Sequence, residues 1–266
     1  MQIFKEEEFF AQPAGFDAVL LWQNHKAMLI AYRNSDPGPG AVYEWSGQPD
    51  QMEIINLLDH LKPESLRVVT AFPKFSLMPA EVLAEPDNRN WHDQLPGKGF
   101  EGLTWTDEKK DLGISVTFGL PAGDFEFLSS LSENQNVEHL AGVVLENMEG
   151  AEFSSIWSKI VLYFTDNQML VVAQKHSKTA LVNSFSYQLA ADALYYLLWV
   201  KKELFANEED VPVFVNGMVK PGSNLHNTLK NYIKPLYFGT SMRRDADDLS
   251  KDFPGHTFQL LRNRKR

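Results

Sequence analysis

Residues 160–174 read IVLYFTDNQMLVVAQ, two apolar runs with a polar turn between them. The runs are Ile160 to Phe164 and Met169 to Gln174, and the turn is Thr165-Asp166-Asn167-Gln168. Short apolar runs joined in this way are typical of a β-hairpin. We therefore expect two antiparallel strands at these positions.

The chain after this hairpin continues with alternating strands and helices. Thr179 to Phe185, Pro212 to Val215 and Leu236 to Phe238 have the composition of strands, whereas Tyr187 to Phe205 and Ser223 to Ile233 have helical periodicity. The apolar stripe expected to face the sheet on the first helix consists of Leu189, Ala193, Tyr196 or Leu197, Val200 and Leu204.

The same order of elements occurs about half a chain earlier, without close identity. The expected strands are Ala18 to Trp22, Ala27 to Tyr32, Ala41 to Trp45 and, after a helix, Leu66 to Phe72. Pro49-Asp50 is expected to start the helix. Its expected apolar positions are Met52, Ile55, Leu58 and Leu61.

Three antiparallel strands, a helix and a strand that joins the same sheet in parallel are the order of a ribonuclease-H-like unit. Two such units in tandem resemble the actin-like ATPase architecture, an α/β fold with mixed sheets. A generic doubly wound domain is the alternative for the second half, but the opening three-strand meander does not fit it.

This interpretation divides the chain into three parts. We expect a first ribonuclease-H-like unit over residues 1–150, with an irregular insertion at about 85–110, and a second unit over residues 151–245. Residues 246–266 are expected to form a C-terminal tail.

Composition restricts the environment and the partners. The chain has no cysteine, so disulfides and thiolate metal sites are excluded. The acidic N-terminus, Met1 to Phe10, does not resemble a signal peptide, and the longest apolar run, Leu194 to Val200, is too short to span a membrane. We therefore expect a cytoplasmic protein with no membrane partner.

The formal net charge of −10 disfavours general binding to nucleic acid, which depends on phosphate contacts. One local exception is a basic C-terminal cluster, which consists of Arg262, Arg264, Lys265 and Arg266. A nucleic-acid-associated factor is a third hypothesis for this chain, and it depends on that cluster alone.

Four short runs carry a resemblance to a known family. They are Phe75-Ser76-Leu77-Met78-Pro79, Asn136-Val137-Glu138-His139-Leu140, Leu194-Tyr195-Tyr196-Leu197-Leu198 and Val213-Phe214-Val215-Asn216-Gly217. With these runs the chain resembles the DUF3822 family of Bacteroidetes-type bacteria over nearly its whole length. More distantly, the tandem units resemble pilus and secretion assembly proteins of the actin-like superfamily. The resemblance implies a fold and no reaction.

An actin-like ATPase binds phosphate with two hairpin turns, each usually with an Asp followed two residues later by Gly. The turn Gln23-Asn24-His25 has neither residue, and the turn at Asp166 and Asn167 has the acid without the glycine. Asn216-Gly217 stands where a Gly-rich adenosine turn is expected. We predict a degenerate nucleotide site formed by Asp166, Asn167, Asn216 and Gly217, with Mg-ATP as its ligand if any binding is retained.

Other chemistries have less support. A two-metal nuclease needs clustered carboxylates, but Asp192 is expected to be solvated or to cap its helix, and Asn216 stands where an acid is needed. The seven histidines show no metal-ligand spacing, and His139 is expected to be a structural histidine. No catalytic residue and no metal site is predicted.

The sequence therefore favours a non-catalytic actin-like scaffold or interaction protein with an unidentified protein partner. Trp91 and Trp105, expected in loops, are candidate anchors for that partner. The alternative is a divergent nucleotide-binding ATPase or a kinase-like enzyme that uses the cleft between the two units.

Overall fold

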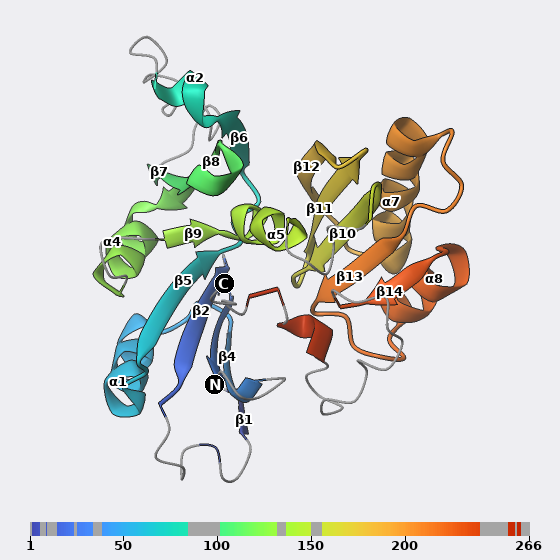
Figure 1. Ribbon diagram of the computed structural model, residues 1–266. Coiled ribbons are helices and arrows are strands. Elements are labelled where there is room, and N and C mark those ends of the chain that lie inside the picture. The colour runs from blue at the N-terminus through green and yellow to red at the C-terminus, as the bar shows by residue number, and fades with distance from the viewer. Residues whose placement is uncertain are drawn as a thin grey trace. The chain divides into compact units, whose positions relative to one another are not determined.

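The computed structural model divides the chain into two compact units, Met1–Gly142 and Val143–Arg266 (Figure 1). The described residues are 2–5, 9, 15–23, 26–33, 39–84, 102–131, 137–149, 156–239, 255–258 and 260–261, of which 2–5, 83–84 and 255 are described for the backbone only. The division falls inside helix α5 (Leu140–Met148), earlier in the chain than the predicted boundary after residue 150.

A six-stranded mixed sheet forms the centre of the first unit. Its strands are β1 (Gln2–Lys5), β2 (Asp17–Gln23), β3 (Lys26–Tyr32), β4 (Pro39–Ser46), β5 (Ser65–Thr70) and β9 (Val137–His139). They lie in the order β1-β4-β3-β2-β5-β9. Strands β2, β3 and β4 form the predicted antiparallel meander, and β5 pairs with β2 in parallel, which confirms the expected topology.

Helix α1 (Gln51–Leu61) joins β4 to β5. The carboxylate of Asp50 caps its first turn by accepting hydrogen bonds from the backbone N–H groups of Met52 and Glu53. The buried positions are Ile54 and Leu58. The prediction that Met52 faces the core is wrong, because its side chain is 60% exposed.

A second, three-stranded sheet is inserted between β5 and β9. It consists of β6 (Phe75–Pro79), β7 (Gly102–Lys109) and β8 (Ile114–Pro121) in the order β6-β8-β7, with the helices α2 (Ala80–Ala84) and α4 (Ala122–Leu131). Residues 102–109 of the expected irregular insertion are therefore an ordered strand, and residues 85–101 lie outside the described residues.

The second unit repeats the topology of the first in a five-stranded sheet. Its strands are β10 (Lys159–Phe164), β11 (Gln168–Lys175), β12 (Lys178–Ser186), β13 (Val213–Gly217) and β14 (Leu236–Phe238). The order is β12-β11-β10-β13-β14, with β13 parallel to β10. The first three strands again form an antiparallel meander, as the sequence predicts.

Helices α7 (Ala190–Phe205) and α8 (Asn224–Tyr232) pack on one face of this sheet, and Figure 1 shows them on the same side of it. The buried side of α7 is formed by Ala190, Ala193, Leu197, Val200 and Phe205. The prediction that Leu189 belongs to this stripe is wrong, because Leu189 is the N-cap residue and 66% exposed. Asp192 caps the helix as predicted, since its carboxylate accepts from the backbone N–H groups of Gln188 and Leu189.

The opposite face of the second sheet is covered from the C-terminal part of the chain. The short helix η5 (Gly255–Thr257) packs on β13, and the carbonyl of Thr257 accepts a hydrogen bond from the buried Tyr163 hydroxyl at 3.0 Å. Phe258, Leu260 and Leu261 are also buried. This part of the predicted tail is therefore a layer of the second unit.

Candidate functional site

The four residues of the predicted nucleotide site lie on two neighbouring parallel strands. In the register of β10 and β13, Tyr163 is opposite Asn216 and Phe164 is opposite Gly217. The turn that holds Asp166 and Asn167 leaves β10 directly after these positions. Since the carboxyl ends of parallel strands lie at one edge of a sheet, the structure brings the predicted residues to the same edge.

Gly217 has a packing role at this edge. Its φ of +83° lies in the left-handed region, which favours glycine. A Cβ atom built on Gly217 would lie 2.1 Å from the carbonyl oxygen of Phe164 and 2.7 Å from its nitrogen. The backbone of β10 thus occupies the space that a glycine in an adenosine-binding turn would leave for its ligand.

The turn after β13 uses its own N–H groups inside the chain. The N–H of Met218 donates to Phe164 O at 2.8 Å, and the N–H of Val219 donates to Gly217 O at 2.9 Å. Gly222 N donates to His226 Nδ1 at 3.3 Å, and Ser223 N donates to Lys220 O at 3.1 Å. A turn that binds a ligand through its backbone needs such groups directed at the ligand. These four are already engaged.

The side chains of Asp166 and Asn167 are exposed. The backbone of their turn is fixed by Tyr187, whose hydroxyl donates to Thr165 O at 3.0 Å and whose N–H donates to Asn167 O at 3.0 Å. Burial, with a contribution from the charge of Asp166, raises the pKa of Tyr187 to about 12. This phenol therefore stays a neutral donor at physiological pH and holds the turn closed.

Asn216 is the unusual member of the set. Its side chain is fully buried, and neither the amide nitrogen nor the amide oxygen has a hydrogen-bond partner among the described residues. A buried amide without partners is costly, and natural proteins seldom keep one without an ordered water, ion or ligand nearby. Asn216 is thus the residue of this edge that most favours a bound molecule.

The corresponding hairpin of the first unit is built differently. Asn24 and His25 of its turn lie outside the described residues. The flanking Gln23 and Lys26 are buried, and the ammonium group of Lys26 forms an ion pair with Glu44 on the neighbouring β4. A cation that is neutralised by its own sheet is not directed at a phosphate.

No group of three or more His, Asp or Glu side chains that could hold a metal ion occurs among the described residues. Asp192, the acid that a nuclease site would need on the long helix, caps that helix instead.

Among the described residues, a cluster of buried charges lies in the first unit, where it joins the two sheets. Glu138 on β9 accepts from the guanidinium of Arg67 on β5, with a distance of 2.6 Å to Nη2, and from Lys109 Nζ on β7 at 2.5 Å. Lys109 Nζ also lies 3.2 Å from Asp107 Oδ1. Asp107 in turn accepts from the backbone N–H of His139 at 2.9 Å.

Burial and charge shift the pKa values of this cluster in opposite directions. Burial raises the pKa of Asp107 to about 6, although the charge of Lys109 opposes the shift. Burial also acts to raise the pKa of Glu138, but the hydrogen bonds and charges of Arg67 and Lys109 outweigh it and lower the pKa to about 2. Glu138 is therefore the ionised centre of the cluster.

His139 lies beside this cluster as a structural residue, as the sequence predicts. Its Nε2 is 2.9 Å from Phe72 O, and its Nδ1 accepts from the N–H of Ala141 at 3.1 Å. Burial lowers the pKa of this histidine to about 4, with a smaller contribution from the charge of Lys109. Both nitrogens of the neutral ring are thus used to fix the start of α5.

The sequence does not reveal this cluster, because the composition of residues 102–109 predicts an irregular segment. The sequence gives no signal for it, because Asp107, Glu108 and Lys109 are all charged, and only the structure shows that Asp107 and Lys109 are buried and Glu108 is exposed. Trp105 lies in the same strand and packs on Phe125 with ring centroids 5.1 Å apart, so its expected place in a loop is wrong. Trp91 and the basic cluster from Arg262 to Arg266 lie outside the described residues.

Comparison with solved structures shows which class of fold the two repeated units form. A protein of unknown function with an actin-like ATPase fold from Bacteroides thetaiotaomicron matches with a TM-score of 0.65 and 16% identity, over 86% of this chain and 93% of that one. The structure of a PilM–PilN type IV pilus biogenesis complex matches with a TM-score of 0.52 and 13% identity, over 92% and 96%. The chain has the actin-like ATPase fold.

The family follows from the sequence itself. The model of the family described as "Protein of unknown function (DUF3822)" matches residues 62–236. The chain therefore belongs to the DUF3822 family, as the four short runs predict. No protein of curated function matches it.

Among the described residues, no helix is both long and apolar enough to cross a membrane.

Proposed function

We propose that this chain is a non-catalytic, cytoplasmic actin-like protein that acts as a scaffold or interaction module. The observation that carries the proposal is the occupied edge of the second sheet. The carbonyl of Phe164 fills the space beside Gly217, and the N–H groups of Met218 and Val219 donate within the chain. A nucleotide whose adenosine used this turn would have to break these contacts before it could bind.

The fold is compatible with an assembly role. One structure with this fold is a complex of two proteins of type IV pilus biogenesis. At 13% identity that likeness carries the fold and does not identify a partner.

A divergent nucleotide-binding enzyme is the second candidate, and the buried Asn216 favours it. Its amide has no protein partner among the described residues, so a ligand that reached this edge could supply one. Mg-ATP is the molecule to test, and Asp166 is the acid that would face the metal.

The deciding experiment is calorimetric titration of the full chain with ATP, ADP and GTP in the presence of magnesium. We expect no saturable heat, and no rise in the thermal unfolding midpoint at millimolar nucleotide, because binding to the native state alone would raise that midpoint. Saturable binding that is lost in Asp166→Ala and kept in Asp59→Ala, an exposed acid of the other unit, would establish the enzymatic alternative.

A further inference from the structure

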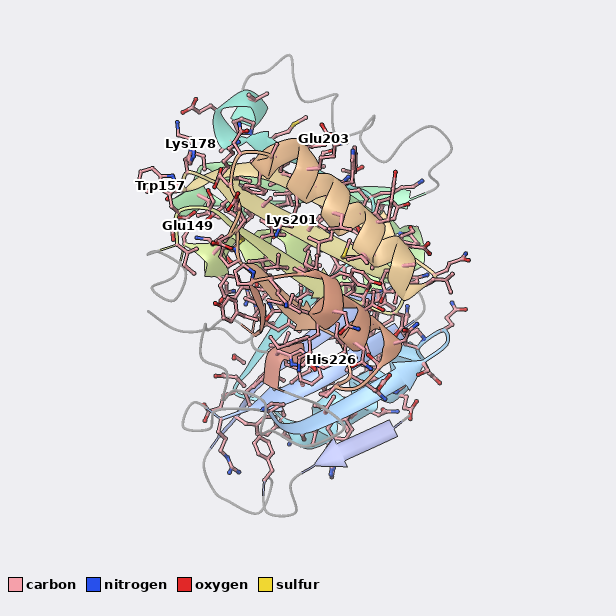
Figure 2. All side chains as sticks on the ribbon, turned by 90° about the vertical axis from the view of Figure 1, so that its right-hand side faces the viewer. Glu149, Trp157, Lys178, Lys201, Glu203 and His226 are labelled. Carbon is pink, nitrogen blue, oxygen red and sulfur yellow. The ribbon has the colours of Figure 1, made fainter. Side chains whose placement is uncertain are left out.

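The outward face of α7 carries an apolar stripe that the fold leaves uncovered. Tyr195 is 66% exposed, Leu198 44% and Trp199 48%. Figure 2 looks onto this helix, whose C-terminal part is marked by Lys201 and Glu203. Isolated exposed apolar residues need no explanation, but several on one helical face indicate a contact surface.

The spacing of the exposed residues is that of a coiled-coil seam. Ala191, Tyr195, Leu198 and Lys202 are all exposed and follow each other at intervals of four, three and four residues. This is the spacing of alternating d and a positions of a heptad, which meet a second helix when two helices pack side by side. We call these four residues the α7 seam.

The aromatic flank of the seam is already held in place. Phe185 on β12 stacks on Tyr196 with ring centroids 4.8 Å apart and meets the ring of Trp199 edge-on at 6.3 Å. A side chain that is fixed before binding loses less conformational entropy in the complex. Trp199 is therefore suited to be part of an interface.

Charge distinguishes between the possible occupants of the seam. Asp192, whose pKa is lowered by backbone hydrogen bonds from Leu189 and Gln188, lies at its N-terminal end, and Lys202 lies at its C-terminal end. The seam is thus acidic at one end, apolar in the middle and basic at the other. A helix of the same sequence in the antiparallel direction complements it at all three places.

We infer that a second copy of this chain covers the α7 seam, with the two α7 helices antiparallel about a twofold axis. In this arrangement a residue of one copy lies opposite the residue of the second copy whose number, added to its own, gives 393. Tyr195 then meets Leu198 of the second copy, and Ala191 leaves room for Lys202, whose ammonium group reaches Asp192. A parallel pair would instead place like charges together.

The inference goes beyond the proposed function, because it depends only on the surface of the second unit and not on the state of the nucleotide edge. A single pair of helices buries less surface than a permanent dimer. We therefore expect a dimer that dissociates on dilution, with a dissociation constant in the micromolar range, about 1–100 µM.

Sedimentation velocity and light scattering of the full chain without nucleotide, over about 1 µM to 1 mM, test the inference. We expect the mass to rise with concentration from 30.3 kDa towards twice that value. Tyr195→Glu should weaken association about tenfold or more. Tyr232→Glu is the matched control: Tyr232 on α8 is 68% exposed, and its substitution should leave association unchanged.

A charge exchange tests the direction of the pair. Lys202→Glu places an acid beside Asp192 of the second copy, and Ala191→Lys places two lysines together, so each alone should weaken association. The double variant Ala191→Lys/Lys202→Glu should restore it only in the antiparallel arrangement, where these two positions meet.

Three results would overturn the inference: a wild-type chain that is monomeric at every concentration, equal effects of Tyr195→Glu and Tyr232→Glu, or a double variant that is no better than the singles. Circular dichroism of each variant identifies any that does not fold. Nucleotide binding in the calorimetric experiment would overturn the proposed function and leave the dimer unaffected.

Discussion

At the scale of one residue, Gly217 shows that a position can keep the residue type of a ligand-binding turn and serve internal packing instead. In the sequence it stands where an adenosine turn is expected, and in the structure its missing side chain admits the backbone of Phe164. The same residue type meets both needs, because glycine permits positive φ and close approach alike. The sequence could place the turn but could not reveal what fills the space beside it.

Two glycines with similar backbone conformations allow these needs to be separated. Gly217→Ala should lower the free energy of unfolding by roughly 3 kcal/mol, since strain at positive φ adds to a clash with a backbone atom that cannot move away. Gly222 has φ +76° with nothing within 4 Å of a built Cβ, so Gly222→Ala should cost only about 1 kcal/mol. Urea denaturation measures both, and equal losses would contradict the packing role.

Among the elements, the inserted sheet shows where the sequence was least informative. The meanders, the parallel fourth strands and both long helices follow from local apolar periodicity, and they were predicted. Strand β7 contains the polar residues Thr104, Thr106 and Asp107, so it lacks the apolar run that identifies a strand in a sequence. Its pairing with β8 and the ion pair of Lys109 with Glu138 on β9 are long-range contacts, which composition does not encode.

The phase of the helices was also only partly predictable. Met52 and Leu189 have the right residue type for the core but lie at a helix end on the solvent side. Periodicity predicts the spacing of the apolar residues on a helix. Which of these residues face the sheet also depends on the residue at which the helix begins.

Glu138 joins β5, β7 and β9, and its removal should loosen the inserted sheet. Glu138→Gln leaves Arg67 and Lys109 without their shared carboxylate, and breaking a buried ion pair in this way costs about 3 kcal/mol. Glu108→Gln on the exposed face of β7 should change the free energy of unfolding by less than about 0.5 kcal/mol. Chemical denaturation at pH 7 measures both.

The pH dependence of this effect has a definite sign. The folded pKa of Glu138 is about 2, below the ordinary value of 4.5, so its contribution is complete above pH 4.5 and is lost as the pH falls through 2. The difference between wild type and Glu138→Gln should therefore shrink on acidification. A difference that stays constant from pH 7 to pH 3 would contradict the ion-pair explanation.

On the scale of the whole molecule, net charge opposes self-association. Each copy has a formal charge of −10 at pH 7, and the sequence isoelectric point is about 5.2. Two such copies repel each other over distances comparable to the Debye length, about 8 Å at physiological salt. Repulsion between the net charges of the two copies therefore weakens the association that the α7 contact provides.

Lowering the pH from 7.5 towards 5.5 should accordingly strengthen the dimer. The negative net charge becomes smaller in magnitude as the pH falls over this range. Asp192 stays ionised, because its pKa is lowered from the ordinary value. Sedimentation equilibrium at fixed ionic strength should give a falling dissociation constant for the wild-type chain. Tyr195→Glu should remain the weaker associator at each pH, and a loss of that difference would point to non-specific aggregation.

The layer formed by residues 256–258, 260 and 261 has a consequence for biosynthesis. The hydroxyl of Tyr163 on β10 donates to the carbonyl of Thr257, which lies 94 residues further along the chain. After β14 has been made and before Thr257 emerges, the strands of the second sheet and the helices α7 and α8 on one face are complete, whereas the C-terminal residues that pack on the opposite face are still absent. Because emerging chains fold from the N-terminal side, this half-covered sheet is the nascent species most exposed to chaperones and to aggregation.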